Sequence, residues 1–397
     1  MNFRTPTSIR ATLEQVTRIR RDPRLMLWTM VVLLFPVYLF ESGVPQPADW
    51  IGLLLLATLV GSWNGRLPPP IVRPLKVLLM FLAYVLAVNV VWSLALFSFS
   101  LNGKDGFLMS PTFYIFNALL FFTFLLMFQR YGEFLLWLTV RLVMVAAFLQ
   151  VLASFVVRSG HGRSTVMFNN PNQLGYYALL SACIILLGQK KFRISTVMVT
   201  AALAACAYLA LLSASKAALA SIGGLGIVLV IGNLRTIALA LLVFGALILT
   251  NNPFSAAIDR AQSRIENDQS YGFVEERGYD RILAFPEYWV VGAGEGAYRR
   301  FKDTSVIGAH ELHSSMATLF FCYGIVGVTL FGLFLWGVIA GAEMRAWLIV
   351  GAAFAYGMTH QGLRFRMLWL LLGLVCCMRE LASRERAARL ARAKESR

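Results

Sequence analysis

The chain has 397 residues, of which 58% are hydrophobic and only 14% are charged. One water-soluble core cannot bury so much apolar side chain, so the composition excludes an ordinary soluble globular protein. The formal net charge of +16 does not indicate nucleic-acid binding, because the arginines gather at the two chain ends beside apolar blocks. That placement is typical of the positive-inside rule and of attraction to anionic membrane lipids.

Apolar blocks long enough to cross a hydrocarbon layer of about 30 Å recur along the chain. We therefore predict an all-α protein, a polytopic membrane helix bundle of about 12 transmembrane helices. The predicted spans are residues 25–40, 49–63, 76–99, 112–129, 133–157, 173–188, 194–212, 216–232, 236–250, 315–339, 346–359 and 365–378.

The spans divide the chain into a basic N-terminal segment (1–24), helices 1–9 (25–250), a large loop (251–312), helices 10–12 (313–378) and a basic tail (379–397). Short basic loops alternate with less basic ones, and short basic loops mark the cytoplasmic side. Both termini are then cytoplasmic, and the large loop, in which we expect short helices, is periplasmic. The five cysteines fall in apolar segments with no disulfide or zinc spacing.

The segment His310-Glu311-Leu312-His313 comes directly before the predicted span 315–339. A neutral imidazole at this boundary can act as a general base at a cavity mouth. It can equally be an interfacial histidine bonded to a backbone carbonyl, and position alone does not separate the two. Upstream, the glycine-rich stretch GAGEGAYRRF indicates either close backbone approach or a simple tight turn.

Several cations fall on the predicted outer side, against the positive-inside bias. Lys216 lies at a membrane boundary, where a lysine either extends to the surface or meets an anion. A gathering of cations favours an anionic partner such as phosphate. The other members are Arg158, Arg163, Arg277, Arg281, Arg364 and Arg366.

A further segment, Asn170-Pro171-Asn172, is typical of a helix start. Its free amides either bind a phosphate or sugar oxygen or are satisfied by simple capping. No acidic pair suited to a divalent cation occurs in the predicted outer loops, so we predict chemistry without a metal or other cofactor.

In this order, the segments resemble those of the O-antigen ligase and polysaccharide polymerase superfamily of bacterial inner-membrane glycosyltransferases. The resemblance covers roughly residues 165–375. Its parts are Asn170-Pro171-Asn172, Ser213-Ala214-Ser215-Lys216, Arg277 or Arg281, Gly292-Ala293-Gly294, His313 and Gly324-Ile325-Val326-Gly327. Two positions depart from the family pattern: Lys216 replaces an arginine, and Ser314 follows His313 where the family often has asparagine.

The resemblance implies a glycan donor on an undecaprenyl-type diphosphate, used at the periplasmic face of the inner membrane. Lys216, Arg277 and Arg281 would then hold the diphosphate, His313 would be the catalytic base, and Glu311 would orient a histidine. Candidates for binding the glycan of the donor or acceptor are His310, His161, Arg163, Asn170, Asn172 and Arg364.

Three activities stay open. Polymerisation of O-antigen or exopolysaccharide repeat units is favoured over ligation of finished glycan to lipid A–core or protein. Partners would include membrane lipids, a glycan or lipid acceptor, and a chain-length regulator or other assembly proteins. The third activity is a transporter or flippase of polyprenyl-linked sugars, which is disfavoured because the informative residues cluster at one face and no internal repeat is visible.

Overall fold

The computed structural model describes residues 22–41, 43–63, 65, 67–100, 106–157, 163–232, 238, 272–301 and 310–395. The regular secondary structure of these residues is entirely helical, and they contain no strand. The α-helices are α2 (Pro23–Leu34), α3 (Pro47–Val60), α4 (Pro69–Ala95), α5 (Met109–Tyr131), α6 (Glu133–Val156), α7 (Pro171–Lys191), α8 (Thr196–Ser213), α9 (Lys216–Gly232), α12 (Phe273–Arg277), α13 (Tyr279–Ala284), α14 (Ser315–Ile339), α15 (Met344–Gly357) and α16 (Arg366–Glu395). Two 3₁₀ helices are η1 (Pro286–Tyr288) and η2 (Tyr298–Phe301).

Five of the described helices are long and apolar enough to cross a membrane, namely α4, α5, α6, α8 and α14. Three more apolar helices, α2, α3 and α15, have 12 to 14 residues and are shorter than a single crossing needs. The all-helical fold is therefore confirmed, and the count of about 12 spans stays a prediction. Almost all of the predicted span 236–250 lies outside the described residues.

Proline sets several helix boundaries, because it fits the first helical turn and is disfavoured in a helix interior. It occupies the first position of α2, α3, α4 and α7. Helix α2 ends at Leu34, two residues before Pro36. It therefore ends before residue 40, where the predicted span 25–40 ends.

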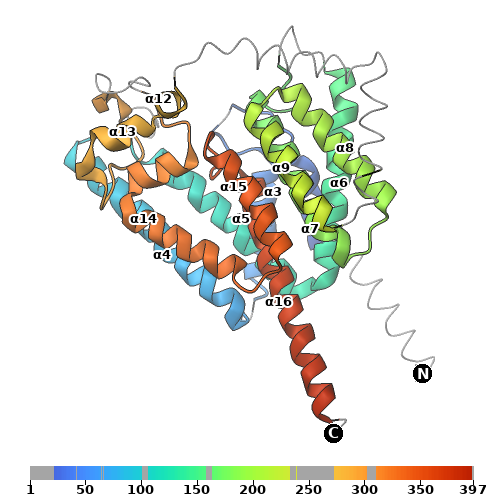
Figure 1. The fold of residues 1–397 in the computed structure, drawn as a ribbon. Coiled ribbons are helices and arrows are strands. Elements are labelled where there is room, and N and C mark those ends of the chain that lie inside the picture. The colour runs from blue at the N-terminus through green and yellow to red at the C-terminus, as the bar shows by residue number, and fades with distance from the viewer. Residues whose placement is uncertain are drawn as a thin grey trace.

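At the other end of the chain, α16 continues to Glu395, far beyond the predicted boundary at residue 378. Residues 379–395 contain no glycine or proline and are rich in Ala, Arg, Glu and Leu, which favour a helix. The described part of the predicted basic tail is thus a helical extension that projects from the bundle (Figure 1).

Helix α7 lies at the centre of one half of the bundle. Every residue from Leu174 to Gln189 is buried, as expected for a helix surrounded on all sides. Its neighbours are α6, α8, α9, α15 and α16. In the other half α14 packs along α4, and the short helices α12 and α13 lie at the end of the bundle opposite the C-terminal part of α16 (Figure 1). The described half of the large loop thus forms short helices, as predicted.

Candidate functional site

The helix start at Asn170-Pro171-Asn172 and the turn between α8 and α9 meet at one place. Arg163 joins them: its Nε donates to the carbonyl of Ser213 at 2.8 Å, and its Nη2 donates to the side-chain oxygen of Asn172. A side chain at Gly175 would place Cβ 2.6 Å from the Ser213 hydroxyl, so glycine is required for this close approach. The two motifs, 40 residues apart in the sequence, therefore form one surface.

The turn that follows Ser213 positions the lysine. Ala214 adopts a left-handed conformation (φ 46°, ψ 37°), and Ser215 is buried with its amide 3.2 Å from the Ser213 hydroxyl. Lys216 is then the first residue of α9 and is half-buried. Its charge lies where the amides of a helix N-terminus are free, a place that favours anions.

The histidine segment is fixed by the loop between α15 and α16. The amide and hydroxyl of Ser315 both donate to the carbonyl of His360, at 3.1 and 3.0 Å. The Tyr279 hydroxyl donates to the Met358 carbonyl at 2.9 Å and lies 2.8 Å from the hydroxyl of Ser314. These contacts hold the two residues that follow His313 against the neighbouring loop.

Ser314 has a local role. It is the N-cap of α14, and its hydroxyl accepts a hydrogen bond from the amide of Ala317 at 3.2 Å. The serine that follows His313 thus begins α14.

The electrostatic surroundings of His313 favour its neutral form. Although the residue remains exposed at the surface, the atoms packed around its ring lower its pKa by desolvation. Glu311 raises the pKa, Arg277 and His310 lower it, and Glu276 raises it, with a net shift below the ordinary value of 6.5. A neutral imidazole near neutral pH has the protonation state that a general base requires.

His360 is the second histidine of this cluster and was not predicted as a site residue. Desolvation lowers its pKa to about 4; the Thr359 carbonyl opposes this shift, whereas the charges of Arg277, Arg163 and His313 add to it. The charge of Arg277 thus acts on both histidines, and that of Arg163 acts on His360. The signal available in the sequence was a fourth histidine in a predicted outer loop.

The two arginines that spacing alone left as alternatives have different surroundings. Arg277 is half-buried on α12, with its Nη2 3.3 Å from a Glu276 carboxylate oxygen, and its charge reaches His313. Arg281 is fully buried, and both its terminal nitrogens donate to the carbonyl of His310 at 3.2 Å. Its guanidinium lies 5.1 Å from the Phe301 ring centre. Arg277 therefore contributes positive charge near His313, whereas Arg281 hydrogen-bonds the backbone of the histidine segment at His310.

The glycine-rich turn enters a break in α14. Gly324 leaves the helical conformation (φ 61°, ψ −169°), so two bonds of the helix ladder are not formed. The amides that lose their partners donate to the incoming turn: Ile325 to the Trp289 carbonyl at 2.7 Å and Val326 to the Val290 carbonyl at 3.4 Å.

The carbonyls freed by the same break are also satisfied. Ala293 and Gly294 donate to the carbonyls of Phe321 and Cys322, at 2.9 Å each. Gly292 has φ 95°, and any Cβ there would lie 2.3 Å from the Cys322 carbonyl oxygen. Gly292 and Gly324, one glycine from each motif, are thus explained by one interlock, which directs the next residue of the turn into the bundle.

That next residue, Glu295, is fully buried. Its carboxylate accepts hydrogen bonds from the hydroxyls of Tyr114 (3.0 Å) and Tyr323 (2.7 Å) and from Arg364. Arg364 also donates to Glu311 at 2.9 Å. Sequence analysis missed Glu295 and placed Arg364 at a glycan; in the structure Arg364 joins two carboxylates.

The remaining predicted residues fall as follows. Asn170 is exposed and caps α7 by accepting from the amide of Asn172 at 2.8 Å. His310 is exposed, and His161 lies outside the described residues. At one end of the bundle Arg163 binds Asn172 and the turn before Lys216, and the charges of Arg277 and Glu311 act on His313.

A groove of small residues runs from this cluster between α9 and α15. Its open space is about 730 Å³, and its lining begins at Ala217, the residue after Lys216. Its lining residues are Ala217, Ala220, Ser221, Gly224, Gly351, Ala352, Ala355 and Thr359.

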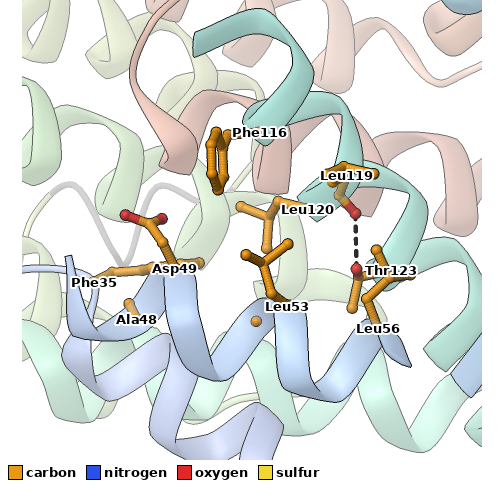
Figure 2. Close-up of a pocket in the computed structure, with 10 residues that line it drawn as sticks. Phe35, Ala48, Asp49, Leu53, Leu56, Phe116, Leu119, Leu120 and Thr123 are labelled. Carbon is orange, nitrogen blue, oxygen red and sulfur yellow. Dashed lines mark hydrogen bonds between the residues drawn. The ribbon is translucent and has the colours of Figure 1, made fainter. Parts of the chain in front are cut away.

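A second, apolar pocket of about 320 Å³ lies between α3 and α5. Figure 2 shows Asp49 at its edge, with Leu53, Leu120 and Phe116 beside it. The Asp49 carboxylate is paired with Arg366 at 3.0 Å and accepts the amide of Gln46 at 2.7 Å. Because its carboxylate is already bound, we do not assign this pocket a reaction.

Across the part of the chain that the structure describes, no group of three or more His, Cys, Asp or Glu side chains is placed to hold a metal ion. A scan of the chain against models of known protein families gives no match. A search of curated proteins finds none with significant similarity to it.

Proposed function

We propose that this chain is a multi-pass membrane glycosyltransferase that moves a glycan from an undecaprenyl-diphosphate carrier to an acceptor hydroxyl without a metal. The observation that carries the proposal is the histidine segment bonded to the loop after α15, where the charge of Arg277 acts on His313 and that of Arg163 on His360; Arg163 also binds the turn before Lys216. The family resemblance supplies the substrate class.

The proposal includes the location of the chain. About 12 spans would place segment 251–312 and the site at the periplasmic face of a bacterial inner membrane, with both termini in the cytoplasm. The arrangement of α12 and α13 at the bundle end opposite the tip of α16 supports this orientation (Figure 1).

In the reaction, His313 takes the proton of the acceptor hydroxyl as its oxygen attacks the anomeric carbon. The bond between that carbon and the phosphate oxygen breaks, and its electron pair leaves with the diphosphate. Arg163, Arg277 and Lys216 stabilise the negative charge that develops on the leaving group. Attack from the side opposite the diphosphate inverts the anomeric configuration.

The groove between α9 and α15 supports a lipid-linked donor. It is lined from Ala217 onward by small and mostly apolar side chains of α9 and α15. An isoprenoid chain fits such a surface, because it is apolar and its burial needs no polar partner.

The decisive test is His313→Ala. Loss of a general base lowers a rate by about 10²- to 10⁴-fold, so we expect glycan transfer to be lost while the protein stays in the membrane at normal level. Lys190→Ala, at an exposed position in the last turn of α7, is the control and should transfer normally. Normal glycan in the His313→Ala strain would remove the base from the mechanism.

Two further measurements separate the related activities. In a deletion strain, loss of long carrier-linked chains indicates a polymerase, which the resemblance favours, and their accumulation indicates a ligase. Purified protein in liposomes, with donor and acceptor on one side, forms product if it is a transferase. Movement of the carrier-linked glycan across the bilayer without product would indicate a flippase instead.

A further inference from the structure

An ion network lies behind the histidine segment. In it Arg364 joins two carboxylates, those of Glu295 and Glu311. A buried charge is costly unless it is paired, and Glu295 is paired through two nitrogens of the Arg364 fork. Its other oxygen is held by the neutral hydroxyls of Tyr114 and Tyr323. Glu295 is thus the inner carboxylate of the network, and Glu311, on the histidine segment, is the outer one.

Exposure agrees with this assignment. The side chain of Glu295 is 0% exposed and that of Glu311 is 40% exposed, so the inner carboxylate is an anchor and the outer one faces the site. The third Arg364 donor, Nη1, donates to Glu311 at 2.9 Å. Glu295 therefore holds Arg364, and Arg364 in turn holds Glu311.

The outer carboxylate acts on His313. The charged and titratable groups around this imidazole are Glu311 and His310 on its own segment, Glu276 and Arg277 on α12, and His360 after α15. Desolvation, Arg277 and His310 lower the pKa of His313, whereas Glu311 raises it. Without Glu311 the imidazole would be a weaker base in a strongly cationic site.

We infer that Glu295 and Arg364 are positioning residues that hold the Glu311 carboxylate beside His313, where it faces the positive charge formed when His313 accepts the acceptor proton. The inference rests on the proposed function, in which that proton comes from the acceptor hydroxyl. A merely structural ion pair would affect folding but would leave the titration of His313 unchanged.

The test measures that titration without measuring glycan transfer. Diethyl pyrocarbonate modifies only neutral imidazole, so the pH dependence of modification, followed by mass spectrometry of the His313 peptide in the purified full chain, gives its midpoint. Glu311→Gln should shift the midpoint to lower pH, and Glu311→Asp, which keeps the charge, should restore most of the shift. Glu295→Gln should shift it in the same direction, although Glu295 does not touch His313.

Tyr323→Phe is the matched control, because it removes a hydrogen bond from Glu295 but leaves the charges of the network intact. Its midpoint should equal that of the unmodified chain. An unchanged midpoint in Glu311→Gln, or equal shifts in Glu295→Gln and Tyr323→Phe, would overturn the inference. Should the Glu295→Gln protein not accumulate in the membrane, the comparison of Glu311→Gln with Glu311→Asp decides the result, because Glu311 is partly exposed. Activity of His313→Ala is a separate measurement, so the inference and the proposed function fail independently.

Discussion

The interlock at the break in α14 predicts a large effect from a single methyl group. In Gly324→Ala the new Cβ would lie 2.2 Å from the Val290 carbonyl oxygen and 2.9 Å from that of Trp289, closer than atoms can approach. The backbone at Gly324 (φ 61°, ψ −169°) is also in a region that only glycine adopts readily, at a cost of about 1–3 kcal/mol for another residue.

Relief of the clash requires the turn to move away from the helix. Its bonds to Ile325 (2.7 Å) and Val326 (3.4 Å) then lengthen or break, each worth about 1 kcal/mol. Strain and lost bonds together amount to about 3–5 kcal/mol, or on the order of 10²- to 10⁴-fold in the ratio of folded to unfolded protein.

The buried cysteines provide the assay. All five are free and inaccessible in the folded chain, so a thiol-reactive dye in detergent reports unfolding during a temperature ramp. The matched control is Gly332→Ala in the same helix, where the new Cβ meets no atom within 4 Å. Alanine is favoured over glycine there by about 0.5–1 kcal/mol. Equal melting of the two variants would show that the turn does not occupy the helix break.

Arg163→Lys keeps the charge but cannot span both of its present oxygen partners, so we expect about a tenfold loss of glycan transfer. Lys190→Arg, the reverse exchange at an exposed position, should leave the rate unchanged. Gly351→Leu fills the groove from a position where Cβ meets nothing, so KM for the polyprenyl-linked donor should rise several-fold; Gly332→Leu, on open surface of α14, should not change it. Since the pKa of His360 falls from 6.5 to about 4 on folding, the unfolded state takes up the extra proton, and thermal stability should fall as pH drops through this window. A His360→Gln variant should lose that part of the pH dependence, whereas an identical pH profile would contradict the lowered pKa.

The helical nature of the chain and the extent of several helices could be predicted from the sequence. Helix α14 has the predicted bounds 315–339 and α9 the predicted bounds 216–232. Each depends on a local apolar run and on bonds between residues four positions apart, which a sequence displays directly. The histidine motif and the cations around it were also visible, as polar residues at the edges of such runs.

Only the tertiary structure decided how the motifs meet. Glu295 lies 206 residues from Asn89, whose side chain accepts the Glu295 amide, and 181 from Tyr114, which donates to its carboxylate. Nothing local marks it as buried. The break at Gly324 likewise depends on a turn about 30 residues upstream that supplies the missing backbone partners. Local hydrogen bonding and hydrophobicity fix which residues become helical; which charges are buried together depends on contacts that exist only once distant helices have packed.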